Sequence, residues 1–476
     1  MNHYLIEGRV TRADRATSPF LYLPFEVAAG TSSIEVSYRY DPGNVIDIGI
    51  FDPRITDFPS RQGFRGWSGG ARASFFVARD GATPGYIAGD LPVGTWRVIL
   101  GLYRIAKQGC RYRVEIDLTT QKRNVIAPVK RISTVRQEAG WYRGDLHSHT
   151  HHSDARGSLG DLVTAAKSRG LDFLAVTDHN TISHHRYLAD ESSSELLLIP
   201  GQEVTTYRGH ANVWGSDGWI DFRITRAEQL DRLVTEVHDR GGLFSVNHPK
   251  GTGSDWRYPF PEDLDCFEVW QAPWSYRNWE ALERYDALLK QGKRVTLVGG
   301  SDRHQPGWPE LDPEALMIGS PTTWLYLAEL SVEAVLEGLR KGKAFVSESP
   351  DGPRLQIFID DTPMGDYLPS ATSSPKSARA IVHGASGDLL RWLAEDGPVR
   401  EVPITSDAFE DCWSWTPQGY FLRAEVLARG NKEQLIAAAG ELEHMGKFPK
   451  QLSFEEVVSH DFIRALSNPI YLRRGR

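Results

Sequence analysis

Residues 142–157, YRGDLHSHTHHSDARG, contain four histidines and two aspartates within sixteen residues. Imidazole and carboxylate groups are ligands that suit Zn²⁺, Mn²⁺ or Fe, and no thiolate lies among them. His147 and His149 are two residues apart, so in a strand both side chains point the same way and can share one ion. Asp154 follows five residues later. A lone His-x-His pair is more often two surface histidines, so the meaning of this segment depends on the rest of the chain.

Residues of the same kinds recur beside short apolar segments downstream. Histidine or carboxylate closely follows FLAVT, LLLIP, LFSVN and VTLVGG, and a histidine precedes ANVWG. Together with the first segment, the candidate metal ligands are His147, His149, Asp154, His179, Glu203, His210, His248, Asp302 and His304. A single TDH or SDRH motif can equally cap a helix or a turn. Nine donors exceed the need of one tetrahedral ion and suit two or three ions bridged by a carboxylate.

The elements that must position these residues alternate between strands and helices from Trp141 onward. SLGDLVTAAKSRG has Ser158 as helix N-cap with Asp161 three residues later. TRAEQLDRLVTEVHDRGG repeats this pattern, and we expect Thr225 and Glu228 to form a capping box. WEALERYDALLKQG and SVEAVLEGLRKG are two further amphipathic helices. Alternating strands and helices predict a parallel sheet or barrel, whose strands end on one face.

Both flanks have a β texture. SSIEVSYRY, TWRVILGLY and CRYRVEIDL alternate apolar and polar residues, and turn-rich segments separate them. After Ser347, segments such as RLQIFID and YFLRAEVLA are again strand-like, KEQLIAAAGELEHMGKF reads as a helical insertion, and ALSNPIYL is a candidate closing strand. We therefore predict three domains: an N-terminal β-sandwich (1–137), an α/β domain of alternating strands and helices (138–347) and a C-terminal β-rich domain (348–476).

Composition narrows the class of protein. The formal net charge of −8 argues against a surface that coats nucleic acid, although it does not exclude a basic pocket. Cys110, Cys266 and Cys412 are too few and too scattered for a disulfide framework or a CxxC zinc site. The opening MNHYLIEGRV has no signal-peptide pattern, and no segment is long and apolar enough to span a membrane. These features predict a cytoplasmic protein.

In their order along the chain, the motifs LHSHT, SD, TDHN, E, GH, NHP and SDRH resemble those of the PHP (polymerase and histidinol phosphatase) superfamily of metallohydrolases. The TDHNT and KGKAFVS segments, the SNPIYL ending and the flanking β regions are most similar to its CehA/McbA-type branch. The motifs cover about residues 140–347.

The resemblance implies a multidomain α/β plus β protein with a distorted (β/α)7 barrel, flanked by N-terminal and C-terminal β-sandwich domains, and a centre of two or three divalent ions (Zn, Mn or Fe). It implies a first ion held by His147, His149, Glu203 and Asp302. It implies that Glu203 bridges to a second ion held by His210 and His248. It implies a third ion held by Asp154, His179 and His304, and some members have histidine where this chain has Asp154.

Such a centre predicts a hydrolase. A water that bridges two divalent cations loses a proton near neutral pH, and the resulting hydroxide can attack a metal-bound phosphoryl group. We expect a metal-dependent phosphoesterase acting on a small phosphomonoester or phosphodiester. Two alternatives stay open: a carbamate or carboxylic ester hydrolase that uses the same site, and a non-catalytic binding protein stabilised by metals. Nucleic acid is expected only as a short nucleotide substrate, because no basic patch with interleaved aromatic residues is present.

Several neighbours of the ligands are candidates for other roles. Lys250 and Arg303 are candidates to bind an anionic group of the substrate, or are surface charges. Asp178 is expected to orient a metal-binding imidazole. Residues 251–263 form a long segment that we expect to cover the site as a lid. Five tryptophans either pack in the core or form an aromatic wall beside the substrate: Trp256, Trp270, Trp274, Trp279 and Trp308. Four loop histidines are either solvated or include a proton donor to the leaving group: His151, His152, His184 and His185.

Overall fold

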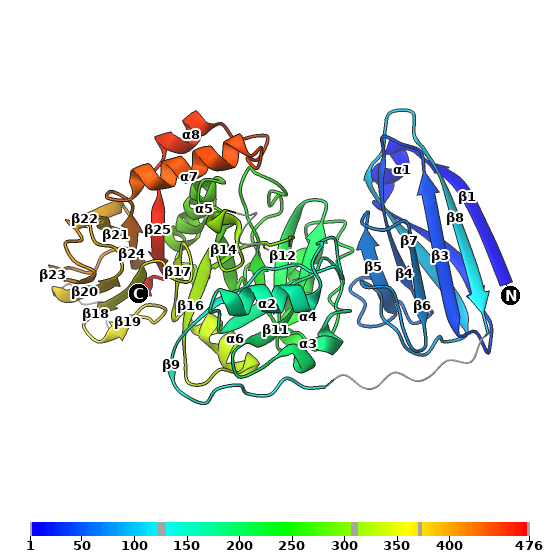
Figure 1. Cartoon of the computed structure of the whole chain (residues 1–476), viewed down its shortest axis with the longest axis horizontal. Helices are drawn as coiled ribbons and strands as arrows, with labels where there is room; N and C mark the ends of the chain where they lie inside the picture. The colour runs from blue at the N-terminus through cyan, green and yellow to red at the C-terminus, as the bar shows by residue number, and fades with distance from the viewer. Residues whose placement is uncertain (1, 121–129, 306–312, 370–373, 474–476) are drawn as a thin grey trace.

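A computed structural model of the chain describes residues 2–120, 130–305, 313–369 and 374–473. Three parts follow one another along the long axis of the molecule (Figure 1). A β-rich part contains the N-terminus, a mixed α/β part lies in the middle, and a second β-rich part contains the C-terminal strands. Among the described residues, no helix has both the length and the apolar character needed to cross a membrane.

The N-terminal part consists of two four-stranded antiparallel sheets that enclose one apolar core. Their apolar residues alternate with polar ones, so one face of each strand is buried; Ile34, Val36 and Tyr38 are examples. The first sheet has the order β1 (Asn2–Val10), β8 (Cys110–Thr119), β3 (Ser33–Tyr40), β6 (Ser74–Ala78). The second has the order β2 (Phe20–Val27), β7 (Gly94–Arg104), β4 (Val45–Phe51), β5 (Phe64–Gly69). The short helix α1 (Arg12–Thr17) lies between β1 and β2 in the chain. We call this part the sandwich.

Seven strands of the middle part are neighbours in chain order within one sheet. They are β9 (Gly140–Asp145), β10 (Phe173–Val176), β11 (Leu197–Thr206), β12 (Gly209–Trp214), β13 (Leu243–Val246), β14 (Cys266–Gln271) and β15 (Thr296–Gly300). The two ends of this row meet, because Ser148 just after β9 pairs in parallel with Arg303 just after β15. The Asp302 amide also donates to the His147 carbonyl at 2.8 Å. The row therefore closes on the side where the strands end.

One strand departs from a uniform alternation of strand and helix. β12 runs antiparallel to both β11 and β13. Only Tyr207 and Arg208 separate β11 from β12, which is too short for a crossover helix and suits a hairpin. Gly209, with φ of +141°, provides backbone freedom at this turn. As a result, the beginning of β12 lies on the same side as the ends of its neighbours.

Helices of the middle part pack against these strands (Figure 1). They are α2 (Leu159–Ser168), α3 (His185–Glu191), α4 (Gln229–Asp239), α5 (Asn278–Lys290) and α6 (Val332–Lys341), with a short 3-10 turn at Glu314–Leu316. The predicted capping box of Ser158 and Asp161 is confirmed at α2. The capping box predicted at Thr225 and Glu228 is wrong, because Thr225 instead binds the Gln229 side chain and α4 begins only at Gln229.

The C-terminal part continues the sheet of the middle part. From β9 the sheet runs through β16 (Thr322–Leu327) and β17 (Ala344–Ser347), then β25 (Ile463–Ser467), β24 (Phe421–Leu427), β21 (Leu389–Ala394) and β22 (Gly397–Pro403). A second sheet has the order β19 (Thr362–Pro363), β18 (Arg354–Ile359), β20 (Lys376–His383), β23 (Ala408–Trp415). The insertion after Arg429 is helical as predicted, with α7 (Lys432–His444) and α8 (Phe454–Ser459). The chain ending supplies β25 and β26 (Ile470–Tyr471), so the closing strand is confirmed.

The sandwich packs directly on the middle part. Phe64 and Trp219 stack with ring centroids 4.3 Å apart and an interplanar angle of 3°. Arg223, paired with Asp221 at 2.7 Å, also donates to the Tyr22 hydroxyl and the Thr56 carbonyl of the sandwich at 3.0 and 3.1 Å. Aromatic stacking and buried charge-assisted hydrogen bonds therefore hold the two parts together.

Candidate metal centre

The predicted ligands come together at one face of the middle part, although they are spread over residues 147–304. Five strands carry ligands at or just beyond their C-terminal ends, and the antiparallel β12 carries His210 at its start. Sequence periodicity alone does not reveal the direction of β12. Because β12 is reversed, His210, which precedes its apolar segment, lies beside the histidines that follow the apolar segments of the other strands.

Glu203 occupies the middle of this group. Its Oε1 atom lies 3.3 Å from His147 Nε2, 3.3 Å from His210 Nδ1 and 3.4 Å from His248 Nε2. Its Oε2 atom lies 2.6 Å from His179 Nδ1. The side chain is fully buried. One carboxylate therefore faces imidazoles on two sides, which is the arrangement of a bridging ligand.

Asp302, which follows β15, contacts His147 and one further histidine, His149. Its Oδ1 atom lies 3.3 Å from His147 Nε2 and 2.9 Å from His149 Nε2. Asp154 lies further out, with half of its side chain exposed, 3.3 Å from His304 Nε2 and 3.6 Å from His179 Nε2. The outer edge of the group is thus open to solvent and the inner part is closed.

The donor atoms fit divalent metal ions. Four overlapping groups of three residues each offer ligand atoms that all lie within 4.8 Å of one another: His147, His248, Asp302; His147, His149, Glu203; His179, Glu203, His210; and His149, His179, His304. His147 Nε2 and Glu203 Oε2 are buried atoms without a hydrogen-bond partner among the described residues. Buried polar atoms are rarely left unpaired, and both of these atoms lie among the candidate ligands. The overlap of the groups suits more than one ion.

Hydrogen bonds behind the ligands fix which atoms face the centre. The His147 Nδ1–H group donates to Glu268 Oε1 at 2.8 Å, which leaves Nε2 with a lone pair for an ion. His304 Nδ1–H donates to the Asp302 carbonyl at 2.9 Å and frees its own Nε2 in the same way. The Asn247 amide donates to Glu203 Oε1 at 2.8 Å. Glu268 and the Asp302 carbonyl thus set the tautomers of His147 and His304.

The electrostatic balance favours charged carboxylates. Burial alone raises the pKa of Glu203, but the neighbouring His210, His147 and His179 rings outweigh it and hold that pKa well below its ordinary value. Burial, with help from His304 and His179, lowers the pKa of His149 to about 4. A neutral imidazole and an ionised carboxylate are the forms that bind a metal ion.

Two ligand positions have a strained backbone. His248 and Asp302 have φ angles of +29° and +52°, in a region that residues with a side chain rarely adopt. Such conformations cost on the order of 1–3 kcal/mol each and are maintained where the surrounding structure requires them. Here they turn two side chains from the strand ends toward Glu203 and His147.

Glu268 and Asp145 belong to the site, and sequence reasoning missed both. The Glu268 carboxylate, on β14, binds His147 and also accepts the His248 amide at 2.9 Å. Asp145 accepts the amides of His147 and Ser301 at 3.0 Å each, which ties the ends of β9 and β15 together. Glu268 left one signal in the sequence, a lone acid inside the apolar segment CFEVW. A buried charge in a strand needs a partner or a function.

The structure places Lys250, Arg303 and Asp178 in supporting contacts. The Lys250 ammonium is buried and donates to the Gln271 carbonyl and to Asn278 Oδ1 at 2.9 and 2.8 Å. Arg303 donates to the Gln305 and Leu316 carbonyls at 3.1 and 2.5 Å.

Asp178 is fully buried and contacts His184, which is not a candidate ligand, at 3.1 Å. It also accepts Thr150 and Ser153 donors at 2.6–3.1 Å. It therefore holds the loop between His149 and Asp154 and does not contact a ligand ring.

The loop histidines are packed, contrary to the expectation of solvated side chains. His152 and His184 are buried; His152 lies 2.7 Å from the Ser183 hydroxyl, and His184 lies 3.0 Å from the Val176 carbonyl. His185 lies 2.9 Å from the Gly201 carbonyl. Burial lowers the pKa of His152 to about 3, so this ring is neutral at physiological pH.

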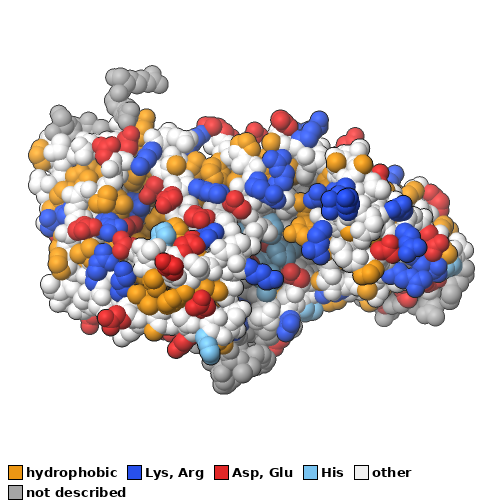
Figure 2. All heavy atoms as spheres, turned by 90° about the horizontal axis from the view of Figure 1, so that it is seen from above, with side chains coloured by type: hydrophobic (Ala, Val, Ile, Leu, Met, Phe, Trp, Pro, Cys, Tyr) orange, Lys and Arg blue, Asp and Glu red, His pale blue; other side chains and the backbone are white. Residues whose placement is uncertain are grey.

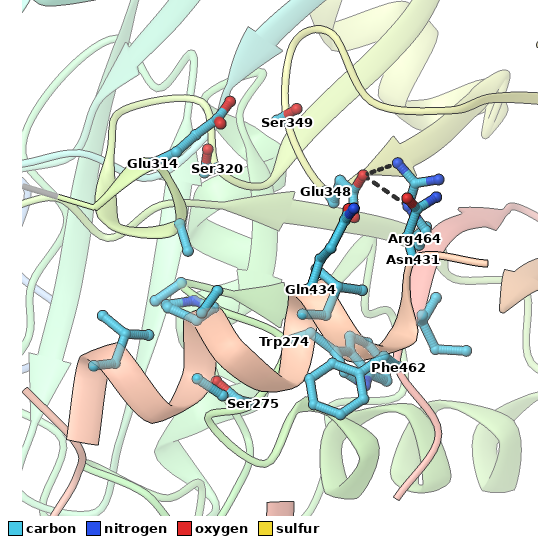
Figure 3. Close-up of a pocket in the computed structure, with 18 of the residues that line it drawn as sticks. Trp274, Ser275, Glu314, Ser320, Glu348, Ser349, Asn431, Gln434, Phe462 and Arg464 are labelled. Atoms are coloured by element: carbon cyan, nitrogen blue, oxygen red, sulfur yellow. Dashed lines mark hydrogen bonds and ion pairs between the residues drawn. The ribbon is translucent and has the colours of Figure 1, made fainter. Parts of the chain in front are cut away.

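The tryptophans do not surround the ligands. Trp270 and Trp274 line a separate cavity of about 270 Å³ beneath α7, together with Phe462 (Figure 3). No candidate ligand lines this cavity. Trp256 is buried and packs against Phe244, and Trp279 stacks on His460. Trp308 lies outside the described residues.

The chain is similar to a protein known from its sequence, to solved structures and to a family model. An uncharacterized protein of Methanocaldococcus jannaschii is 27% identical over 149 residues, which is 27% of this chain and 82% of the relative.

Two solved structures are more distant. A two-domain protein from Bacteroides vulgatus, described as containing a predicted PHP-like metal-dependent phosphoesterase, shares 18% identity with a TM-score of 0.37, over 64% of this chain and 95% of that one. An amidohydrolase from Chromobacterium violaceum with bound sulfate and no metal shares 14% identity with a TM-score of 0.24, over 34% and 88% of the two chains.

The family model described as PHP domain matches residues 145–290. This segment holds the ligands from His147 to His248, while Asp302 and His304 lie beyond it. The match supports the PHP superfamily for the part of the chain that forms the centre.

Proposed function

We propose that the chain is a metal-dependent phosphoesterase that hydrolyses a small phosphomonoester or phosphodiester at a centre of two or three divalent ions. The observation that carries this proposal is the position of Glu203, whose two carboxylate oxygens face His147, His210 and His248 on one side and His179 on the other. Bound divalent ions would supply Lewis acidity, both to activate water and to neutralise charge on a phosphoryl oxygen.

The residues of the chain would hold the ions and orient the ligand side chains. Glu203 with His147, His149 and Asp302 would hold a first ion, and Glu203 with His210 and His248 a second. Asp154, His179 and His304 would hold a third at the solvent edge, where half of the Asp154 side chain is exposed. Glu268 fixes the His147 ring, and Gln271, held by Asn278, donates to Asp302 Oδ2 at 3.0 Å.

The finer assignments are part of the same proposal. The barrel is a distorted (β/α)7 barrel in which the β11–β12 hairpin interrupts the repeat. The assignment to the CehA/McbA-type branch rests on the sequence motifs.

A panel of phosphate monoesters and small diesters, assayed with Mn²⁺ or Zn²⁺, tests the function. Turnover should be abolished by EDTA. His248→Asn should lower it by at least about a hundredfold, because metals contribute several kcal/mol to such reactions. His238→Asn is the matched control, since this histidine lies on α4 and contacts Asp265 at 2.7 Å.

The absence of any EDTA-sensitive turnover across the panel refutes the proposal. Aryl carbamates or carboxylic esters assayed beside aryl phosphates separate the alternative hydrolase. Faster, metal-dependent cleavage of the carbamate would establish that alternative.

A further inference from the structure

The centre opens into a cavity of about 950 Å³ whose walls come from two parts of the chain. Asp154, His179 and His210 line its inner end, and residues of the sandwich line the opposite wall. Figure 2 shows histidine side chains at the floor of the hollow between the two parts, with Lys and Arg side chains around it. The sandwich therefore forms part of the space that a substrate must occupy.

The wall of the cavity that the sandwich forms makes close contacts with the β11–β12 hairpin of the middle part. The Tyr207 hydroxyl, from the β11–β12 hairpin, donates to Asp47 Oδ2 of the sandwich at 2.7 Å. Gly101 leaves room for it, since a Cβ atom there would lie 2.2 Å from the Tyr207 oxygen. Tyr103 packs beside Tyr207, with ring centroids 5.3 Å apart, and remains half exposed. These contacts fix the two tyrosines at the junction.

Three arginines line the same cavity around these tyrosines: Arg15, Arg104 and Arg257. Arg15 Nε donates to the carbonyls of Leu102 and Tyr103 at 2.7 and 3.1 Å, which anchors it beside Arg104. Arg257 donates to the Tyr207 carbonyl at 2.5 Å. Within the described residues no hydrogen bond or ion pair engages the Arg104 side chain.

Among the described residues, no ion pair joins the acidic side chains of the cavity to Arg15, Arg104 or Arg257. Asp255 is paired with Arg284 at 2.8 Å, and Asp47 is engaged by Tyr207. Asp154 lies at the inner end beside His179 and His304. The cavity thus has histidines and carboxylates at one end and guanidinium groups at the other. A guanidinium group binds phosphate or carboxylate through paired hydrogen bonds.

We propose that the substrate carries a second anionic group, separate from the bond that is cleaved, and that Arg15 and Arg104 of the sandwich with Arg257 bind it. This inference rests on the proposed function. It assigns the sandwich a role in substrate selection, and it makes a small molecule with a phosphate at one end and a phosphate or carboxylate at the other the preferred substrate class.

Three matched series of substrates test the inference: n-alkyl phosphates, ω-carboxyalkyl phosphates and α,ω-alkanediol bisphosphates, each of increasing chain length. The wild-type kcat/KM should be higher for the doubly anionic compounds at one chain length. The ratio of kcat/KM for a doubly anionic compound to kcat/KM for the n-alkyl phosphate of the same length measures the preference. Arg104→Ala should reduce this ratio by about tenfold, the size expected for a charge-assisted hydrogen bond, and Arg104→Glu should reduce it further. Preference for the bisphosphates or for the carboxylates identifies the anion that is bound.

Arg39→Ala is the matched control, because Arg39 is an exposed arginine on β3, in the sheet that does not line the cavity. It should leave the ratio unchanged. Inhibition constants of n-alkyl and ω-carboxyalkyl phosphonates, whose C–P bond is not hydrolysed, should show the same dependence on Arg104 without turnover.

The outcomes separate the two proposals. If neither these series nor the panel of monoesters and small diesters shows EDTA-sensitive hydrolysis, the proposed function fails. If esters are hydrolysed but the wild type shows no preference for a second anion, or Arg104→Ala and Arg104→Glu retain the preference, the inference about the sandwich is overturned while the phosphoesterase stands.

Discussion

At the scale of single residues, the centre depends on groups that never contact an ion. His147 has two ring nitrogens, and only the acceptor at Nδ1 determines which of them faces Glu203 and Asp302. Glu268 is that acceptor, at 2.8 Å, and the same carboxylate holds the backbone at His248. One buried acid therefore orients residues assigned to two different ions.

Replacing Glu268 by Gln should weaken metal binding. The amide keeps the size of the side chain but removes the charge that favours the proton on His147 Nδ1, and such supporting contacts contribute about 10- to 100-fold to affinity. Competition with a chromophoric chelator measures the change. Glu337→Gln, on the exposed face of α6, is the control and should bind metal as the wild type does. Equal affinities for both variants would show that Glu268 does not support the centre.

Asp47 should make stability depend on pH. Burial raises its pKa from an ordinary value of 3.8 to about 6, against the opposing effects of Tyr207 and His179. Between these two values the folded state binds more protons than the unfolded state, so stability falls as the pH rises from about 4 to about 6 and stays lowered above it. The upper limit of this cost is about 3 kcal/mol.

Asp47→Asn removes the titration and keeps an acceptor for Tyr207. In metal-free protein, urea unfolding should show the variant gaining stability relative to the wild type as the pH rises from about 4 to 7. Glu35→Gln, exposed on β3, serves as the control. A stability difference that does not change with pH would contradict the raised pKa.

At the scale of elements, the sequence predicts what local patterns encode. Apolar segments followed by histidine or carboxylate identify the strand ends, because periodicity and strand-end chemistry are both local. The direction of β12 is not encoded locally, because the apolar pattern of GHANVWG is compatible with a parallel or an antiparallel strand. Only the two-residue connection from β11 indicates a hairpin. Glu268 was missed because a single acid within an apolar segment does not reveal its partner. The arginine-lined cavity joins residues 15, 104 and 257, which no sequence spacing connects.

The two helix starts give a prediction at this scale. Ser158 caps α2 by accepting a hydrogen bond from the Asp161 amide, whereas the amide and hydroxyl of Thr225 both donate to the Gln229 side chain. Ser158→Ala should therefore cost about 1 kcal/mol of unfolding free energy. Thr225→Ala should cost clearly less, because it removes no backbone cap. Urea denaturation of both variants measures the two losses, and a loss for Ser158→Ala no larger than that for Thr225→Ala would contradict the predicted advantage of the capping box at α2.

At the scale of the whole molecule, the three parts of the chain make different contributions to the site. The middle part supplies every candidate ligand, the C-terminal strands extend its sheet through β17 and β25, and the sandwich closes one side of the cavity. If the sandwich selects the substrate, then its attachment to the middle part matters for activity as well as for stability. Asp221 and Arg223 are central to that attachment, because Asp221 also accepts the Ser60 amide of the sandwich at 3.0 Å.

Arg223→Met tests this division. The variant loses the hydrogen bonds to Tyr22 and Thr56 and leaves Asp221 buried without its cation, a change that typically costs about 3–5 kcal/mol. We expect lower stability, a reduced preference for doubly anionic substrates, and a metal affinity within about twofold of the wild type, the scatter normal for single contacts. The control is Arg113→Met, an arginine whose partners Glu7 and Glu115 lie within the sandwich itself. A variant that loses metal affinity in step with substrate preference would show that the sandwich supports the centre directly, whereas a loss confined to substrate preference assigns it the role of selecting the substrate.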